Sequence, residues 1–148
     1  MKHVWSILCR RAISDESTQQ VSLLEVIDGF IVPDNVGEGL LAAEADFVTV
    51  WERDDERVGE RQNARVTVFD PKGEAIGTPL IYEVDLENAP RARNTTRFPG
   101  FPIRGLGTHT IQLESEDPAD DSWRNIYEYK VSLAPLARLA QSAVQQER

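Results

Sequence analysis

Residues 123–133 read WRNIYEYKVSL, and this stretch decides the fold class. Apolar and polar side chains alternate along most of it: Trp123, Tyr127, Tyr129, Val131 and Leu133 against Arg124, Glu128, Lys130 and Ser132. A period of two is typical of a β-strand, because successive side chains of a strand point to opposite faces of the sheet. The pattern predicts a strand that packs one face on a core and exposes the other face to water.

The same alternation recurs at residues 80–86 and 108–114. It places Tyr82, Ile111 and Leu113 on the core side. Val131 of the segment 123–133 and Trp5 of the segment 2–10 are expected to be core residues as well. Further segments rich in Val, Ile, Phe, Trp and Thr are expected to be strands: 2–10, 21–32 with a break near Asp28-Gly29, 45–52, 64–70 and 93–103. The spacing predicts an all-β chain, an antiparallel β-sandwich of about eight strands over residues 1–135.

Turn signals separate these segments, and the strongest is Asp70-Pro71-Lys72-Gly73, since Pro presets a turn and Gly tolerates a positive φ. Pro99 and Pro102 cannot donate hydrogen bonds to a strand ladder. The segment that contains them is therefore expected to be a sheet edge, a bulge or a crossing between sheets.

After Pro135 the period changes to that of a helix, with one apolar face made of Leu136, Leu139, Ala140, Ala143 and Val144. The sequence predicts a short amphipathic C-terminal helix or tail over residues 136–148. A helix of about thirteen residues is marginal in isolation. It is expected to dock either on its own domain or on a partner.

Composition restricts the classes of partner. The 148 residues carry a formal charge of −9, which repels the phosphates of nucleic acids and anionic membranes. Every apolar stretch is shorter than the roughly 20 residues that a membrane-spanning helix needs. With one cysteine, Cys9, the chain cannot form an internal disulfide, so a cytoplasmic location is expected.

Four segments show a recognisable layout along the chain. They are the strand Leu8-Cys9-Arg10, the turn through Asp15 and Thr18, the strand 21–24 with the following Gly29-Phe30-Ile31, and the strand 107–113. In this layout the chain resembles a group of uncharacterised bacterial single-domain β-sandwich proteins. The resemblance implies the fold and no particular activity, because it consists of strand and turn patterns. Those proteins often have Tyr where His109 stands.

Catalytic and zinc motifs are absent from the sequence. There is no G-x-S-x-G motif, and one Cys with two distant His cannot form a four-ligand zinc site. His109 shares its strand face with Ile111 and Leu113, so it is expected to be a buried histidine and not a catalytic base. Cys9 shares a face with Trp5 and is expected to be a small buried residue. We predict no catalytic residues, no cofactor and no enzyme activity, with an enzyme of unrecognised type as the remaining alternative.

Acidic residues gather in the loops 14–20, 53–62, 87–92 and 116–122, which would lie at one end of the sandwich if every connection joined antiparallel neighbours. Calcium takes six to eight oxygen ligands, and separate loops can supply them. The weak calcium candidates are Asp54, Asp55, Asp117, Asp120 and Asp121. The alternative is a solvated acidic rim that keeps the protein soluble.

Residues 88–113 are basic, in contrast to the acidic loops. They contain four Arg and no acid, which gives this segment a charge of +4 in an acidic chain. An Arg-bearing edge strand could receive an acidic peptide, since guanidinium groups pair with carboxylates. The same charges could serve only to protect the edge from unwanted sheet pairing.

The function that these patterns favour is a non-enzymatic protein-interaction or accessory module with a protein partner or a homo-oligomer. The predicted binding residues are Arg93, Arg97, Phe98 and Phe101 of the edge, and Leu136, Leu139 and Val144 of the helix. The alternative function is a calcium-dependent binding domain that uses the acidic loops.

Overall fold

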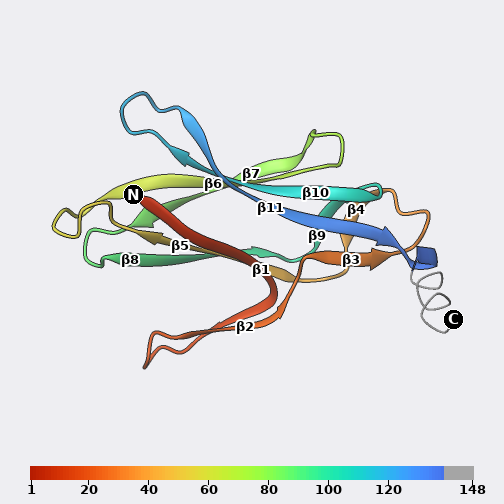
Figure 1. The fold of residues 1–148 in the computed structure, drawn as a ribbon, viewed down its shortest axis with the longest axis horizontal. Helices are drawn as coiled ribbons and strands as arrows, with labels where there is room; N and C mark the ends of the chain where they lie inside the picture. The colour runs from red at the N-terminus through yellow and green to blue at the C-terminus, as the bar shows by residue number, and fades with distance from the viewer. Residues whose placement is uncertain (139–148) are drawn as a thin grey trace, which may run out of the picture.

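A computed structural model describes residues 1–138, which form eleven β-strands and a short helical turn at 136–138 (Figure 1). The strands are β1 (Lys2–Ser14), β2 (Val21–Val26), β3 (Gly29–Val32), β4 (Glu38–Leu41), β5 (Ala45–Glu52), β6 (Arg61–Phe69), β7 (Ala75–Asp85), β8 (Arg91–Phe98), β9 (Phe101–Arg104), β10 (Gly107–Glu116) and β11 (Trp123–Pro135). The predicted all-β class is confirmed.

The strands form three sheets. A four-stranded antiparallel sheet has the order β2-β1-β5-β8, and a five-stranded sheet has the order β3-β11-β10-β6-β7. A small third sheet pairs β4 with β9. In the five-stranded sheet β3 runs parallel to β11, so the expectation of purely antiparallel pairing needs correction.

The number of strands also exceeds the expected eight or so. The segment 21–32 breaks at Asp28 as predicted, but its two halves, β2 and β3, join different sheets. The segment 93–103 likewise divides into β8 and β9, so the Pro-containing stretch is a crossing between sheets, one of the three predicted alternatives. β4 was not predicted, because its sequence, EGLL, shows no alternation.

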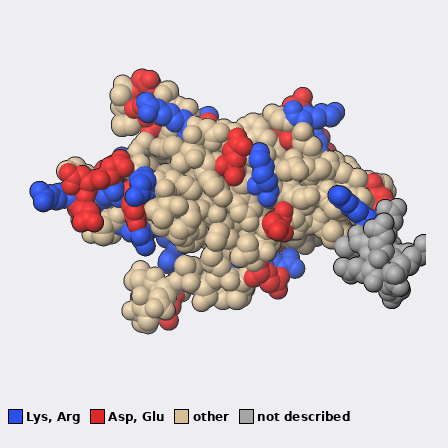
Figure 2. All heavy atoms as spheres, in the orientation of Figure 1, with Lys and Arg blue, Asp and Glu red and all other residues tan. Residues whose placement is uncertain are grey.

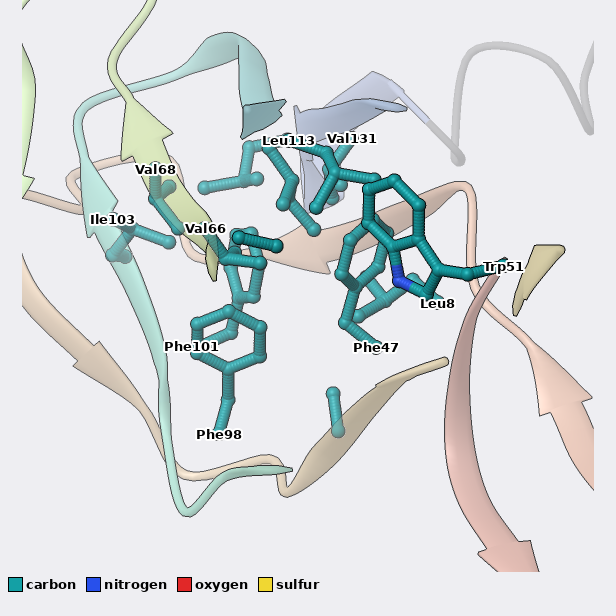
Figure 3. Packing of buried hydrophobic residues seen from close by; sticks show 14 of the residues in the cluster. Leu8, Phe47, Trp51, Val66, Val68, Phe98, Phe101, Ile103, Leu113 and Val131 are labelled. Carbon is teal, nitrogen blue, oxygen red and sulfur yellow. The ribbon is translucent and has the colours of Figure 1, made fainter. Parts of the chain in front are cut away.

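One apolar core lies between the two larger sheets (Figure 3). Leu8, Phe47 and Trp51 of the four-stranded sheet contribute to it, as do Leu113 and Val131 of the five-stranded sheet. These side chains are almost fully buried, so each contributes about 1.5–3 kcal/mol or more to folding.

The predicted core positions Ile111, Leu113 and Val131 are confirmed as buried. Tyr82 is only partly buried and packs against the margin of the core. Trp5 is a correction. It is partly buried but lies on the opposite face of its sheet, because β1 contains an irregularity between His3 and Trp5 that shifts the register against β5.

The predicted turn at Asp70–Gly73 is present. Gly73 has a φ of +84° and donates its backbone N–H to the Asp70 carbonyl at 3.0 Å. The Asp70 carboxylate accepts the backbone N–H groups of Lys72 and Glu74 at 2.9 and 2.8 Å. Together these bonds close the turn between β6 and β7.

Of the segment 136–148, the structure describes a short helical turn at 136–138. Ala137 donates its backbone N–H to the Asp34 carboxylate at 3.2 Å, which ties the end of β11 to the loop after β3. Leu136 is exposed, whereas the predicted binding residues Leu139 and Val144 lie outside the described residues. Over residues 1–138, no helix has the length and apolar character needed to span a bilayer.

Candidate functional site

The candidate site is the face of the four-stranded sheet that points away from the core, called here the outer face. Because directly paired antiparallel residues share a face, the register defines its members. They are Lys2, Trp5, Ile7, Cys9, Arg11 and Ile13 of β1, Ser22, Leu24 and Val26 of β2, Asp46, Val48, Val50 and Glu52 of β5, and Arg91, Arg93, Thr95 and Arg97 of β8.

The middle of the outer face is apolar although it lies outside the core. Cys9, Val48 and Val50 are almost fully buried but do not belong to the core cluster. Toward the β2 side the apolar side chains become exposed, and Leu24 and Val26 have exposed fractions of 46% and 61%. The β1–β2 hairpin folds back toward β8, since Arg93 of β8 donates to Ser14 and Gln19 of this hairpin, and Figure 1 shows the hairpin below β5 and β8. The exposed apolar side chains of this face are therefore those of the hairpin, Ile13, Leu24 and Val26. Grouped exposed apolar side chains are typical of an interaction site.

The outer face is also basic. Five Lys or Arg and two Asp or Glu give it a formal charge of +3, whereas the whole chain carries −9. Both acids are already paired. Asp46 accepts two hydrogen bonds from Arg97 at 2.8 and 3.1 Å, and Glu52 pairs with Lys2 and Arg91. The excess positive charge is therefore not neutralised by the acids of this face.

Arg11 and Arg93 carry two of the three excess charges, and the third arises because Lys2 and Arg91 share Glu52. Arg93 donates to the Ser14 hydroxyl at 3.3 Å and to the Gln19 carbonyl at 3.5 Å, both uncharged acceptors. Arg11 is exposed, and its positive charge helps to lower the pKa of Asp46. Among residues 1–138, neither guanidinium forms an ion pair with an acid.

The Asp46 carboxylate holds three strands of this face together. It is almost fully buried and also accepts the Ala12 backbone N–H at 2.9 Å, so it joins β5 to β8 and β1. The hydrogen bond from Arg97 lowers the pKa of Asp46 and outweighs the effect of burial, which raises it. The carboxylate thus stays ionised and fixes the position of Arg97.

Cys9 lies beside this carboxylate. Burial and the negative charge of Asp46 raise the pKa of the Cys9 thiol, which therefore stays protonated. Because the thiolate is the reactive form, this cysteine is a buried structural residue, as the sequence predicts.

The predicted binding residues divide between surface and core. Arg93 and Arg97 lie on the outer face of β8, which is an edge strand as predicted. Phe98 and Phe101 need correction, because they are 6% and 0% exposed and belong to the core. Their rings pack at a centroid distance of 5.6 Å where the chain crosses from β8 to β9. They support the edge from inside and do not face a partner.

Leu24 and Val26 were missed by the sequence analysis. Residues 21–26 read VSLLEV, which does not alternate strictly, so the sequence did not show which side chains face outward. The only signal was the pair of adjacent leucines at 23 and 24, of which one must face away from the core if the segment is a strand.

The acidic loops lie toward one end of the molecule, at the left in Figures 1 and 2, as the alternation of connections predicts. Their calcium candidates have other partners. Asp54 pairs with the N-terminal ammonium group, Asp55 accepts the Arg57 backbone N–H at 2.9 Å, and Asp120 accepts that of Ser122 at 3.0 Å.

Asp117 pairs with Arg124 and accepts the backbone N–H of Ala119 at 2.9 Å, and Asp121 follows in the same turn with a φ of +55°. In the part of the chain that the structure describes, no three His, Cys, Asp or Glu side chains are grouped so that they could hold a metal ion. Calcium binding thus remains a prediction without a preformed cluster of side chains to support it.

A pocket lies between β4, β9 and the Asp70 turn. It is lined by ion pairs of Arg104 with Asp70, Glu38 and Glu74. His109 is fully buried and does not line the pocket, and its Nε2 accepts the Arg104 backbone N–H at 2.9 Å.

Burial lowers the pKa of His109, which favours the neutral ring that this hydrogen bond requires. The prediction that His109 is buried is confirmed. No protein-family model matches the chain, and no curated protein matches it in sequence.

Proposed function

We propose that this protein is a non-enzymatic protein-interaction module, built as a β-sandwich from its two larger sheets, and that the outer face is its docking surface. The proposed occupant is a second protein that presents acidic and apolar side chains. The observation that carries the proposal is the combination of exposed apolar side chains with a charge of +3 on one face of a chain of −9.

The apolar part supplies the affinity in this proposal. Ile13, Leu24 and Val26 are each about half exposed or more, and Trp5 and Ile7 extend the apolar surface along β1. Burial of such area under a partner stabilises a complex by about 25 cal/mol per Å² before the costs of association.

The basic part supplies the specificity. Symmetric pairing of two identical outer faces would bring Arg11 and Arg93 of both copies into one interface, where like charges cost several kcal/mol. An acidic partner instead neutralises these groups. The charge pattern therefore favours a different protein over a second copy of this chain.

The proposal keeps two further elements. The exposed Leu136 supports the predicted contact role of the C-terminal segment, which would extend the interface beyond the sheet. The single, buried cysteine supports a cytoplasmic location, where a domain of this size needs no disulfide.

The test is affinity capture from the native cell with matched variants. The bait with both Leu24→Ser and Val26→Ser removes the exposed apolar groups of β2, and Ile81→Ser is the control. Ile81 is 62% exposed on β7 of the other sheet, so the control removes a similar group elsewhere.

We expect one or more proteins to bind the wild type and the control but not the double variant, with similar melting temperatures for all three. A partner that binds the double variant as well as the wild type contradicts the proposal. Absence of any specific partner for the wild type contradicts it equally.

A further inference from the structure

We infer that His109 is a pH-sensitive switch, which in its neutral form holds the 104–107 turn (Arg104-Gly105-Leu106-Gly107) closed and on protonation releases it. The turn joins β9 of the small third sheet to β10 of the five-stranded sheet. This switch lies outside the four-stranded sheet that carries the outer face, and it does not depend on the proposed docking surface.

The hydrogen bond between His109 and Arg104 requires a neutral imidazole. His109 is 0% exposed, and its Nε2 accepts the Arg104 backbone N–H at 2.9 Å. A ring nitrogen accepts a hydrogen bond only when it carries no proton, so the neutral ring has its proton on Nδ1. Protonation adds an N–H at Nε2 that points at the N–H of Arg104. Two donors cannot share a hydrogen bond, so the bond is lost and two buried donors face each other.

The backbone of the turn can change shape once this bond is lost. Gly105 and Gly107 have φ values of +73° and +116°, a region that glycine enters and leaves without the steric penalty of a side chain. Leu106 between them is 38% exposed, so the turn is only partly held by burial. Gly105 donates its backbone N–H to the Gly37 carbonyl at 3.1 Å, so movement of the turn also reaches the loop before β4.

The core limits how far the release extends. Phe101 and Ile103 of β9 are 0% and 3% exposed and belong to the core cluster. They hold β9 in place, and the two larger sheets keep their own hydrogen-bonded ladders. Protonation of His109 is therefore expected to open the turn locally and not to unfold the domain.

The charged groups near the imidazole already have other partners. The Oδ1 atom of Asp70, in the β6–β7 turn, accepts the backbone N–H groups of Lys72 and Glu74. Its Oδ2 atom accepts the Arg104 guanidinium at 3.2 Å. Glu38 of β4 and Glu74 pair with the same guanidinium, and Lys72 lines the same pocket. The acids at this end of the molecule are thus directed at Arg104 and at backbone N–H groups.

Burial sets the direction of the pH response. It lowers the pKa of His109, whereas the Gly107 backbone and the negative charge of Asp70 raise this pKa by less. The closed form therefore binds a proton less readily than the released form, whose imidazole has the ordinary pKa of about 6.5. The turn is held closed above this pH and opens increasingly as the pH falls below it. One unit below, the open fraction is larger by up to about tenfold.

Hydrogen exchange of the full chain, followed by NMR at about pH 7.5 and about pH 5.5, tests the inference. After correction for the intrinsic exchange rate, the protection of the Arg104 amide should fall several-fold, by up to about tenfold, at the lower pH. The protection of Ile111, in the middle of β10, should stay the same at both values.

His109→Gln and His3→Gln are the matched variants, because these are the two histidines of the chain. Glutamine at position 109 offers a carbonyl oxygen at a reach similar to that of Nε2, and it does not titrate. The protection of Arg104 should therefore be independent of pH in this variant. His3 lies on β1, so the His3→Gln variant should respond at Arg104 as the wild type does.

The imidazole itself gives a measurement that does not require the His109 variant to fold. Nitrogen NMR of the wild type, assigned with the His3→Gln variant, should show an unprotonated Nε2 on His109 at about pH 7.5 and titration below about pH 6.5. A protonated Nε2 at the higher pH overturns the inference. Protection of Arg104 that does not change with pH in the wild type also overturns it, as does an equal fall in protection in the His109→Gln variant.

Discussion

Replacement of Leu113 by Ala is expected to destabilise the protein strongly, and Leu24→Ala provides the matched comparison. Leu113 is 0% exposed on β10, where it pairs with Val66 of β6 and Tyr127 of β11. Leu24 is 46% exposed on β2. The two variants remove the same three carbon atoms, so any difference in their effect reflects the burial of the site.

The magnitudes follow from burial. Loss of three buried carbons at about 0.8 kcal/mol each gives roughly 2.4 kcal/mol for Leu113, and the cavity left in a closed core raises the cost to about 3–4 kcal/mol. At Leu24 nearly half of the side chain is already in water and no closed cavity forms. The cost there should be about 1 kcal/mol or less.

Urea unfolding followed by tryptophan fluorescence measures both values, provided that the m-value is the same as in the wild type. For a chain of this size, the Leu113 variant should also melt roughly 6–16 °C lower. A difference between the two variants below about 0.5 kcal/mol would refute the assignment of β10 to the core and of Leu24 to the outer face.

Three further predictions concern other features. The pKa of Asp46 is lowered in the folded state, so its contribution to stability is present above about pH 4, the unfolded pKa. This contribution is lost as the pH falls through the folded pKa. In acid titrations followed by circular dichroism, Asp46→Asn should therefore flatten this part of the stability profile. Gly29→Ala should lower the melting temperature far more than Gly37→Ala, because a Cβ at residue 29 would lie 2.7 Å from the Ser132 carbonyl oxygen, whereas one at residue 37 meets no atom within 4 Å. Millimolar calcium should leave the melting temperature unchanged, and a rise of several degrees would instead support calcium binding by the acidic loops.

The strands themselves could be predicted because their signal is local. Residues 45–52 form β5 as expected, and the alternation in 108–114 and 127–133 identified the core side of β10 and β11 correctly. Trp123 is a correction: the register shift after Leu113 places it on the other face, where Arg65 stacks on its ring at 4.4 Å. The Asp70–Gly73 turn was equally predictable, since Pro and Gly restrict the backbone through their own covalent structure.

The candidate site was only half predictable. The charge anomaly of residues 88–113 pointed to Arg93 and Arg97, but composition could not show that the neighbouring Phe98 and Phe101 point inward. Their inward direction depends on where the chain leaves one sheet for another, and that depends on contacts between segments distant in sequence.

The amino-acid sequence by itself determined the all-β class, most strand positions, the strongest turn and the acidic balance of the chain, because each depends on neighbouring residues or on totals. Only the tertiary structure decided the parallel pairing of β3 with β11 and the composition of the outer face. Leu24, Arg11 and Arg93 lie in three different strands, and Leu24 and Arg93 are 69 positions apart in the sequence. They share one surface because the hydrogen-bonded register of β2, β1, β5 and β8 sets which side chains point the same way, and no local pattern specifies a register between distant strands.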